Sequence, residues 1–131
     1  MTEGRIGDEA GQTVIAVIDR DRGVLAAIGR LLRAHGFHVE GFASVEAFLS
    51  RDCKAEPACL LLDVDLGGTS GFSLMHCLGA GDAPLPVIVI TATEEESTQR
   101  RASAAGCVAY LRKPFSAADL IAAIETAARP K

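Results

Sequence analysis

The run Val14-Ile-Ala-Val-Ile18, followed directly by Asp19-Arg-Asp21, decides the fold. An uninterrupted run of five apolar residues is typical of a strand that is buried on both faces of a parallel sheet. Three similar runs follow along the chain, and polar residues stand at the end of each. These are Asp63 after residues 59–62, Thr91 after residues 87–90, and Lys113 after residues 107–111.

The rest of the chain alternates these short runs with longer segments in which apolar residues recur every three or four positions. This alternation predicts a doubly wound α/β fold in which helices cover a parallel sheet. Residues 37–42 alternate polar and apolar side chains, so we place that strand at the sheet edge. We expect strands at 13–18, 37–42, 58–62, 87–91 and 107–111, helices at 21–35, 44–50, 93–105 and from Ser116, and a third helix after a loop containing Gly67, Gly68 and Gly71.

Length and composition indicate one domain. The chain has 131 residues, of which 49% are hydrophobic, enough to fill a single core. Residues 1–12 read as a flexible polar tail, and 13–131 as the domain. A net charge of -4 without a basic patch argues against direct binding to nucleic acid, and no run is long and apolar enough for a membrane span. Four cysteines without C-x-x-C spacing indicate reduced thiols, so we expect a cytoplasmic protein.

The polar residues at the strand ends predict one shared site. The carboxyl ends of parallel strands lie along one edge of the sheet, and ligands bind at that edge. Asp19 and Asp63 offer hard oxygen ligands, which suit Mg2+, while Thr91 and Lys113 can hold phosphoryl oxygens. Each residue alone has a plainer explanation as a helix cap, a turn residue or a solvated charge. Their joint occurrence at four strand ends favours a site for Mg2+ and a phosphoryl group.

Short motifs surround the four strand ends in a fixed order. The triplet Lys113-Pro-Phe115 is weak evidence alone but strong evidence in register with the other motifs. These are Val17-Ile-Asp-Arg-Asp21, Leu61-Leu-Asp-Val-Asp65 with Gly68-Thr-Ser-Gly71, Val89-Ile-Thr-Ala92, and Tyr110-Leu-Arg-Lys-Pro-Phe115.

This succession resembles the receiver domain of bacterial two-component response regulators over residues 13–129. Residues 36–37 and 44–49 make the chain most similar to receivers of the nitrogen-fixation regulator type. The resemblance implies a flavodoxin-like (βα)5 fold with strand order 2-1-3-4-5. It also implies a signalling domain that is not an enzyme, whose partners are a sensor histidine kinase or phosphotransfer protein and a downstream protein effector. Homodimerisation through the last helices fits such a domain, although no surface in the sequence singles it out.

The resemblance also assigns roles to individual residues. Asp63 would accept the phosphoryl group, and Mg2+ would be held by Asp19, Asp63 and the backbone carbonyl of Asp65. Thr91 and Lys113 would grip the phosphoryl group. Tyr110 would follow Thr91 inward and rearrange the face formed by the fourth helix, fifth strand and fifth helix. The peptide bond between Lys113 and Pro114 would be cis.

Arg20 departs from the family pattern, because an acidic side chain that contacts the metal usually stands there. Asp19, Asp63, Arg20 and Lys113 already sum to zero charge without a metal. In one hypothesis Arg20 folds into the pocket, pairs with both aspartates and weakens or replaces Mg2+. In the other, Arg20 points to solvent, and Asp21 or Asp65 supplies the missing oxygen for a weaker Mg2+ site.

Two readings from other classes stay open. A degenerate receiver that no longer accepts phosphate would act as a phosphorylation-independent interaction module. A flavin- or nucleotide-binding protein of the same fold would need a Gly- or Ser/Thr-rich phosphate loop after the first strand. The sequence Asp19-Arg-Asp-Arg22 is unlike such a loop. The kinase, the pathway and the output are not encoded in any of these motifs.

Overall fold

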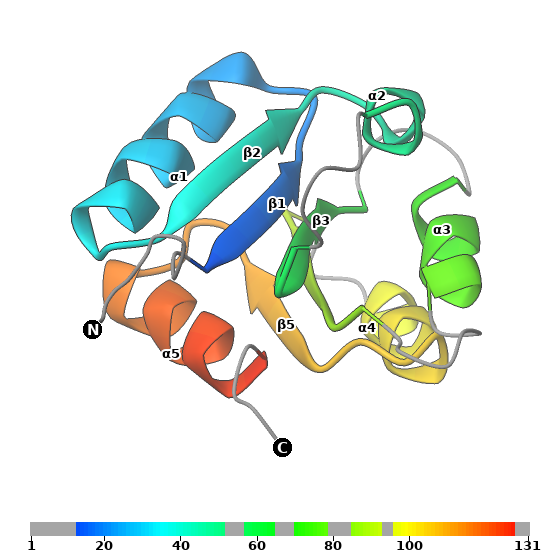
Figure 1. Ribbon diagram of the computed structural model, residues 1–131. Helices are drawn as coiled ribbons and strands as arrows, with labels where there is room; N and C mark the ends of the chain where they lie inside the picture. The colour runs from blue at the N-terminus through cyan, green and yellow to red at the C-terminus, as the bar shows by residue number, and fades with distance from the viewer. Residues whose placement is uncertain (1–12, 52–56, 65–69, 79–84, 93–95, 128–131) are drawn as a thin grey trace, which may run out of the picture.

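The computed structural model describes residues 13–51, 57–64, 70–78, 85–92 and 96–127. Its centre is a five-stranded parallel sheet of order β2-β1-β3-β4-β5 (Figure 1). This order confirms the predicted flavodoxin-like fold and places β2 at an edge. The strands are β1 Val14–Ile18, β2 His38–Phe42, β3 Cys59–Asp63, β4 Val87–Thr91 and β5 Ala109–Arg112.

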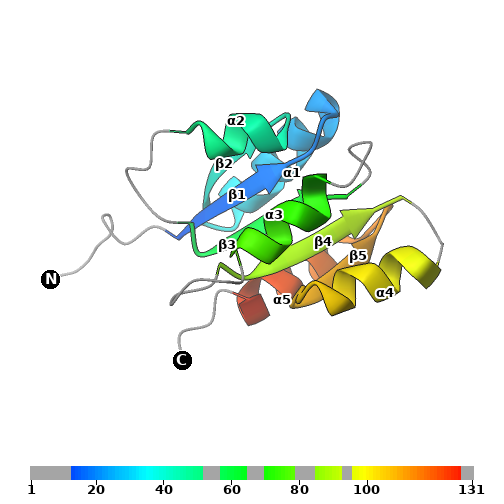
Figure 2. The same cartoon turned by 90° about the vertical axis from the view of Figure 1, so that its right-hand side faces the viewer.

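Helices cover both faces of the sheet. Figures 1 and 2 show one group of helices on one face and a second group on the other. The first group is α1 Arg22–Ala34 and α5 Ala117–Ala127, and the second is α2 Val45–Leu49, α3 Ser70–Leu78 and α4 Glu96–Ala104. No helix of the described segments combines the length and the apolar character that a membrane crossing requires.

The strands fill two cores because successive side chains of a strand point to opposite faces. In β1, Ile15 and Val17 pack with Ile28 and Leu32 of α1 and with α5. Ala16 and Ile18 join the opposite core, where Phe48 of α2, Leu74 of α3 and Ala102 of α4 pack. The two cores hold the sheet rigidly from both sides, so the carboxyl ends of its central strands have fixed positions.

Local chemistry explains where α1 and α5 begin and where α1 and α4 end. The backbone N–H groups of Gly23 and Val24 donate to Asp21 Oδ1 at 2.8 and 3.3 Å, so Asp21 caps α1. Ser116 caps α5 by accepting from the Asp119 N–H at 3.0 Å. Gly36 and Gly106 follow α1 and α4 with φ of 90° and 93°, a backbone region that favours glycine.

The start of β5 and the start of α3 differ from the predicted boundaries. The predicted strand at 107–111 is wrong at its start, because the Cys107 N–H donates to Ala102 O at 3.1 Å and still belongs to the close of α4. Gly71 is not a loop residue, because it lies in the first turn of α3. The first three residues of the helix expected at 93–105 and the tail at 1–12 lie outside the described residues, and the described helix α4 has Glu96 in its first turn.

Candidate functional site

The structure brings the four predicted strand-end residues to the same edge of the sheet. Asp63 and Thr91 are the last residues of β3 and β4, Asp19 follows β1, and Lys113 follows β5. Two backbone bonds extend the sheet past the strand ends. The Asp19 N–H donates to Phe42 O at 3.0 Å, and the Lys113 N–H donates to Thr91 O at 2.8 Å. The backbone beneath the site is therefore part of the hydrogen-bonded sheet and not of a loose loop.

Lys113 is the cation at the centre of this cluster. Its Nζ donates to Asp19 Oδ2 at 2.9 Å and lies 3.4 Å from Asp63 Oδ2. Asp19 and Asp63 are only 1% and 3% exposed. Two buried carboxylates that contact the same ammonium lie close enough to repel each other, and the ammonium between them offsets that repulsion. The arrangement holds two buried carboxylates beside an ammonium group that can bind further negative charge.

The pKa of Lys113 is the result of opposing effects. Burial alone would lower the pKa, because it removes water from the ammonium. The hydrogen bond to Asp19 and the charges of Asp63 and Asp19 act the other way and outweigh burial, so the pKa of Lys113 is raised above its ordinary value. The lysine is therefore charged at neutral pH.

Arg20 does not pair with the aspartates. It is exposed, and among the described residues it forms no ion pair with Asp19 or Asp63, whose shared cation is Lys113. The first hypothesis, in which the guanidinium folds in between the two carboxylates, is thus not the arrangement that the structure shows. Physically, Lys113 already occupies the position between the carboxylates, and the exposed guanidinium keeps its hydration.

Asp21 also lies outside the cluster of charged side chains. Its Oδ1 accepts the two N–H groups at the start of α1, and its own N–H donates to Asp19 Oδ1 at 2.9 Å. The plainer explanation of Asp21 as a helix cap is the one the structure gives. Asp65, the other candidate for a missing oxygen, lies outside the described residues.

The described residues offer two carboxylates to a divalent cation at this edge of the sheet, those of Asp19 and Asp63. Asp19 and Asp63 are oxygen donors of the right kind, but each has an oxygen in contact with Lys113 Nζ. Within the described segments, no three His, Cys, Asp or Glu side chains come together in a way that could hold a metal ion. The residue next to Asp19 in the sequence, which could supply a further carboxylate, is Arg20.

Thr91 and Tyr110 lie on neighbouring strands. Thr91 is fully buried at the end of β4, and Tyr110 of β5 is half-buried against the core that contains Ala102 of α4. The register aligns Thr91 with Arg112, two residues beyond Tyr110. The peptide bond between Lys113 and Pro114 is cis.

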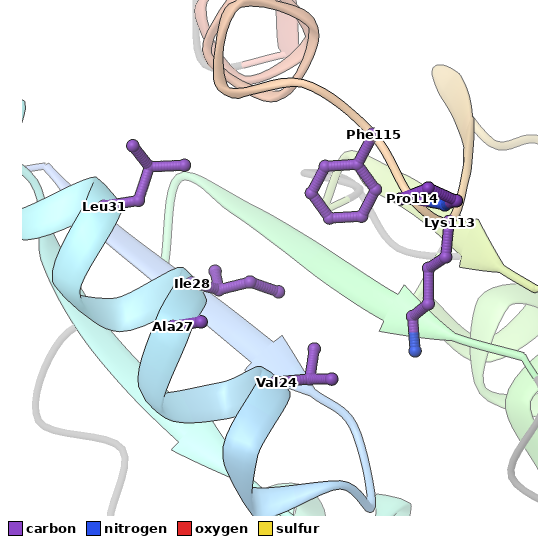
Figure 3. Close-up of a pocket in the computed structure, with 7 residues that line it drawn as sticks. All are labelled: Val24, Ala27, Ile28, Leu31, Lys113, Pro114 and Phe115. Atoms are coloured by element: carbon purple, nitrogen blue, oxygen red, sulfur yellow. The ribbon is translucent and has the colours of Figure 1, made fainter.

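An apolar groove of about 380 Å3 lies beside the site and was missed at the level of sequence. Figure 3 shows Val24, Ile28 and Leu31 of α1 on one side, Phe115 and Pro114 on the other, and Lys113 with its ammonium directed away from the apolar side chains. The spacing of Val24, Ile28 and Leu31 along α1 is typical of a buried helix face, so the sequence alone does not reveal the groove. Only Ile28 is fully buried, and Val24 and Leu31 are partly exposed in the groove.

The sheet order and the lysine-bridged carboxylates define a flavodoxin-like domain whose edge suits a phosphoryl group. The chain belongs to the response regulator receiver domain family, whose model matches residues 15–125. Receiver domains of this family carry a phosphoryl group on an aspartate and generally bind Mg2+.

Characterised relatives and solved structures agree. The chain is 34% identical over 116 residues to the response regulator protein TmoT of Ectopseudomonas mendocina, covering 88% of this chain and 53% of that protein. It is 34% identical over 110 residues to the transcriptional regulatory protein FixJ of Azorhizobium caulinodans, covering 84% and 52%. A receiver protein from Burkholderia phymatum superimposes with a TM-score of 0.78 at 34% identity, covering 89% and 95%. The chain spans about half the length of the curated relatives it matches.

Proposed function

We propose that this receiver domain accepts a phosphoryl group on Asp63 from a histidine kinase or a phosphotransfer protein. The observation that carries the proposal is the ammonium of Lys113 between two buried carboxylates at the carboxyl edge of the sheet. A carboxylate oxygen of Asp63 attacks phosphorus, and the leaving group of the donor departs with the bonding electrons. Lys113 and Thr91 then hold the phosphoryl oxygens, as a charge-assisted donor and a hydroxyl donor.

Mg2+ binds more weakly here than in a receiver that has an acid in place of Arg20. The positive guanidinium next to Asp19 lowers the local attraction for a dication and removes one carboxylate from the donor set. Asp19, Asp63 and the carbonyl of Asp65 are the groups that would hold the ion. When bound, Mg2+ would supply positive charge for the oxygens of the phosphoryl group.

Phosphorylation switches the face formed by α4, β5 and α5. Thr91 moves toward the phosphoryl group, and Tyr110 follows it inward, away from its half-buried position. The contacts of Tyr110 with the core beneath α4 support this coupling. A phosphoryl group on Asp63 thus changes a surface more than one strand away.

The downstream partner is a protein effector that binds the switched face. The chain acts in the cytoplasm as a phosphate-accepting switch and turns over no separate substrate. The match to the FixJ protein supports a nitrogen-fixation-regulator-like subtype, and the match to TmoT shows that the likeness extends to other regulators.

The test is the intact mass of the chain after incubation with acetyl phosphate, with Mg2+ and with EDTA. The expected result is a gain of one phosphoryl group that is absent in Asp63→Asn. A matched control is Asp119→Asn, which changes an exposed acid in the first turn of α5 and should leave the gain intact. No gain under either condition would instead favour a degenerate receiver that acts as an interaction module.

A further inference from the structure

Arg20 lies next to Asp19 at the edge of the proposed phosphoryl site, and its side chain is exposed. Its backbone is anchored on both sides, because the Asp19 N–H is bonded to Phe42 O and the Asp21 N–H to Asp19 Oδ1. Its side chain is exposed and makes no hydrogen bond or ion pair with the described residues. The residue thus has a fixed position one residue from a carboxylate of the site and a side chain that is free to turn.

The charge of the phosphorylated site shows what this side chain can do. A phosphoryl group on Asp63 replaces one negative charge by about two. In a receiver with two acids after the first strand, those acids, the phosphoryl group, the lysine and Mg2+ leave one net negative charge. Here Asp19, the phosphoryl group, Lys113 and Arg20 leave the same single negative charge with no metal. Compared with such a receiver, this chain has one acid fewer and one cation more, because Arg20 stands in place of the second acid. Together these two differences compensate for the two positive charges of Mg2+.

We propose that Arg20 is a ligand of the phosphoryl group, and that it allows Asp63 to be phosphorylated without Mg2+. This proposal rests on the proposed role of Asp63 as phosphoryl acceptor. In the unphosphorylated chain Lys113 satisfies both carboxylates, and Arg20 stays in solvent. As phosphorus is transferred, Lys113 alone cannot neutralise the added charge, and the guanidinium turns from the rim onto the phosphoryl oxygens.

The chemistry is balanced without a further reactant. With acetyl phosphate as donor, an oxygen of Asp63 forms the new bond to phosphorus, the bond from phosphorus to the acetyl oxygen breaks, and acetate leaves with the electron pair. Arg20 stays protonated throughout. The planar guanidinium can donate two parallel hydrogen bonds to two phosphoryl oxygens, a geometry that the ammonium of Lys113 lacks.

The experiment compares the rate at which the full chain is phosphorylated by acetyl phosphate in EDTA with the rate in Mg2+. The intact mass of the chain, recorded over time, measures both rates. For the wild type we expect rates within about twofold of each other. Arg20→Ala should react about tenfold to hundredfold more slowly in EDTA, because it loses a charge-assisted hydrogen bond to the phosphoryl group. Arg20→Asp should react well only in Mg2+. Arg22→Ala, which removes a neighbouring exposed arginine in the first turn of α1, should behave as the wild type.

A second readout does not depend on the rate of transfer. Trifluoroberyllate mimics a phosphoryl group on a carboxylate, and its binding can be followed by fluorine NMR. The wild type should bind it in EDTA, Arg20→Ala should not, and Arg20→Asp should bind it only with Mg2+. This result would separate a ligand of the phosphoryl group from a residue that only helps the donor to approach.

The outcomes distinguish the inference from the proposed function. If the wild type is phosphorylated only in Mg2+, or if Arg20→Ala equals the wild type in EDTA, the role of Arg20 is wrong while Asp63 remains the acceptor. If the wild type gains no phosphoryl group and binds no trifluoroberyllate under either condition, the acceptor role fails, and the role of Arg20 fails with it.

Discussion

Replacing Lys113 by methionine tests the electrostatics of the site most sharply. The substitution keeps an unbranched apolar stem of similar length and removes the ammonium, which lies 2.9 Å from Asp19 Oδ2 and 3.4 Å from Asp63 Oδ2. Both carboxylates are almost fully buried, so water cannot replace the lost cation well. We therefore expect the chain to fold less stably at neutral pH, although the new side chain is more hydrophobic.

The expected loss is about 3 kcal/mol. At an effective dielectric constant of about 20, each of the two contacts gives about 5 kcal/mol of gross attraction. The cost of desolvating the ammonium offsets part of this sum, and breaking a buried pair typically costs about 3–5 kcal/mol. The Lys113 side chain is 23% exposed, which places the loss at the lower end of that range.

Urea unfolding followed by circular dichroism measures this loss. At pH 7.5 the free energy of unfolding of Lys113→Met should be about 3 kcal/mol below that of the wild type. Adding Asp63→Asn should recover at least about 1 kcal/mol, because it removes one of the two repelling charges. Arg30→Met, which deletes an exposed cation of α1, is the control. A loss under about 0.5 kcal/mol would refute the reasoning.

Three further predictions concern residues away from the ammonium. Burial raises the pKa of the Cys59 thiol from 9.0 to about 12. As the pH rises, this thiol therefore ionises in the unfolded chain before it ionises in the folded one, and at pH 10.5 the difference should lower the free energy of unfolding by about 2 kcal/mol. Unfolding curves at pH 8 and 10.5 should show that loss in the wild type and not in Cys59→Ala, and an equal loss in both would contradict it. Gly36→Ala should lower the unfolding free energy by about 1–2 kcal/mol, because φ is 90° there, and an unchanged urea midpoint would show that the turn relaxes. Asp21→Ala removes the N-cap of α1 and should lower the free energy of unfolding by about 1 kcal/mol in the same urea assay. The Mg2+ affinity measured by calorimetry should stay unchanged, and a large drop in that affinity would make Asp21 a metal ligand.

The sequence predicts the sheet and its site edge well because both depend on strong, local patterns. The solid run at 14–18 predicts a buried strand and the alternating run at 37–42 an edge strand, and the structure agrees for β1 and β2. The start of β5 was predicted too early because Cys107 is apolar like a strand residue. It still forms the hydrogen bond that closes α4, which no strand pattern can reveal.

Two features of the site depend on side-chain direction and were beyond the reach of sequence. Arg20 lies two residues beyond Ile18, the last residue of β1, so strand alternation does not determine which way its side chain points, and its pairing stays open at the level of sequence. Lys113, which lies 94 residues after Asp19 in the chain, occupies the position between the carboxylates, and Arg20 stays exposed. The groove beside Phe115 likewise depends on how far α1 stands from the loop before α5.

The most direct measurement is to locate the phosphoryl group chemically. Borohydride reduces an aspartyl phosphate to homoserine, and peptide mass spectrometry after treatment with acetyl phosphate identifies the modified position. The account predicts homoserine at position 63 in the wild type and none in Asp63→Asn. Homoserine at another aspartate, or at none in the wild type, would contradict the central claim that Asp63 is the phosphoryl acceptor.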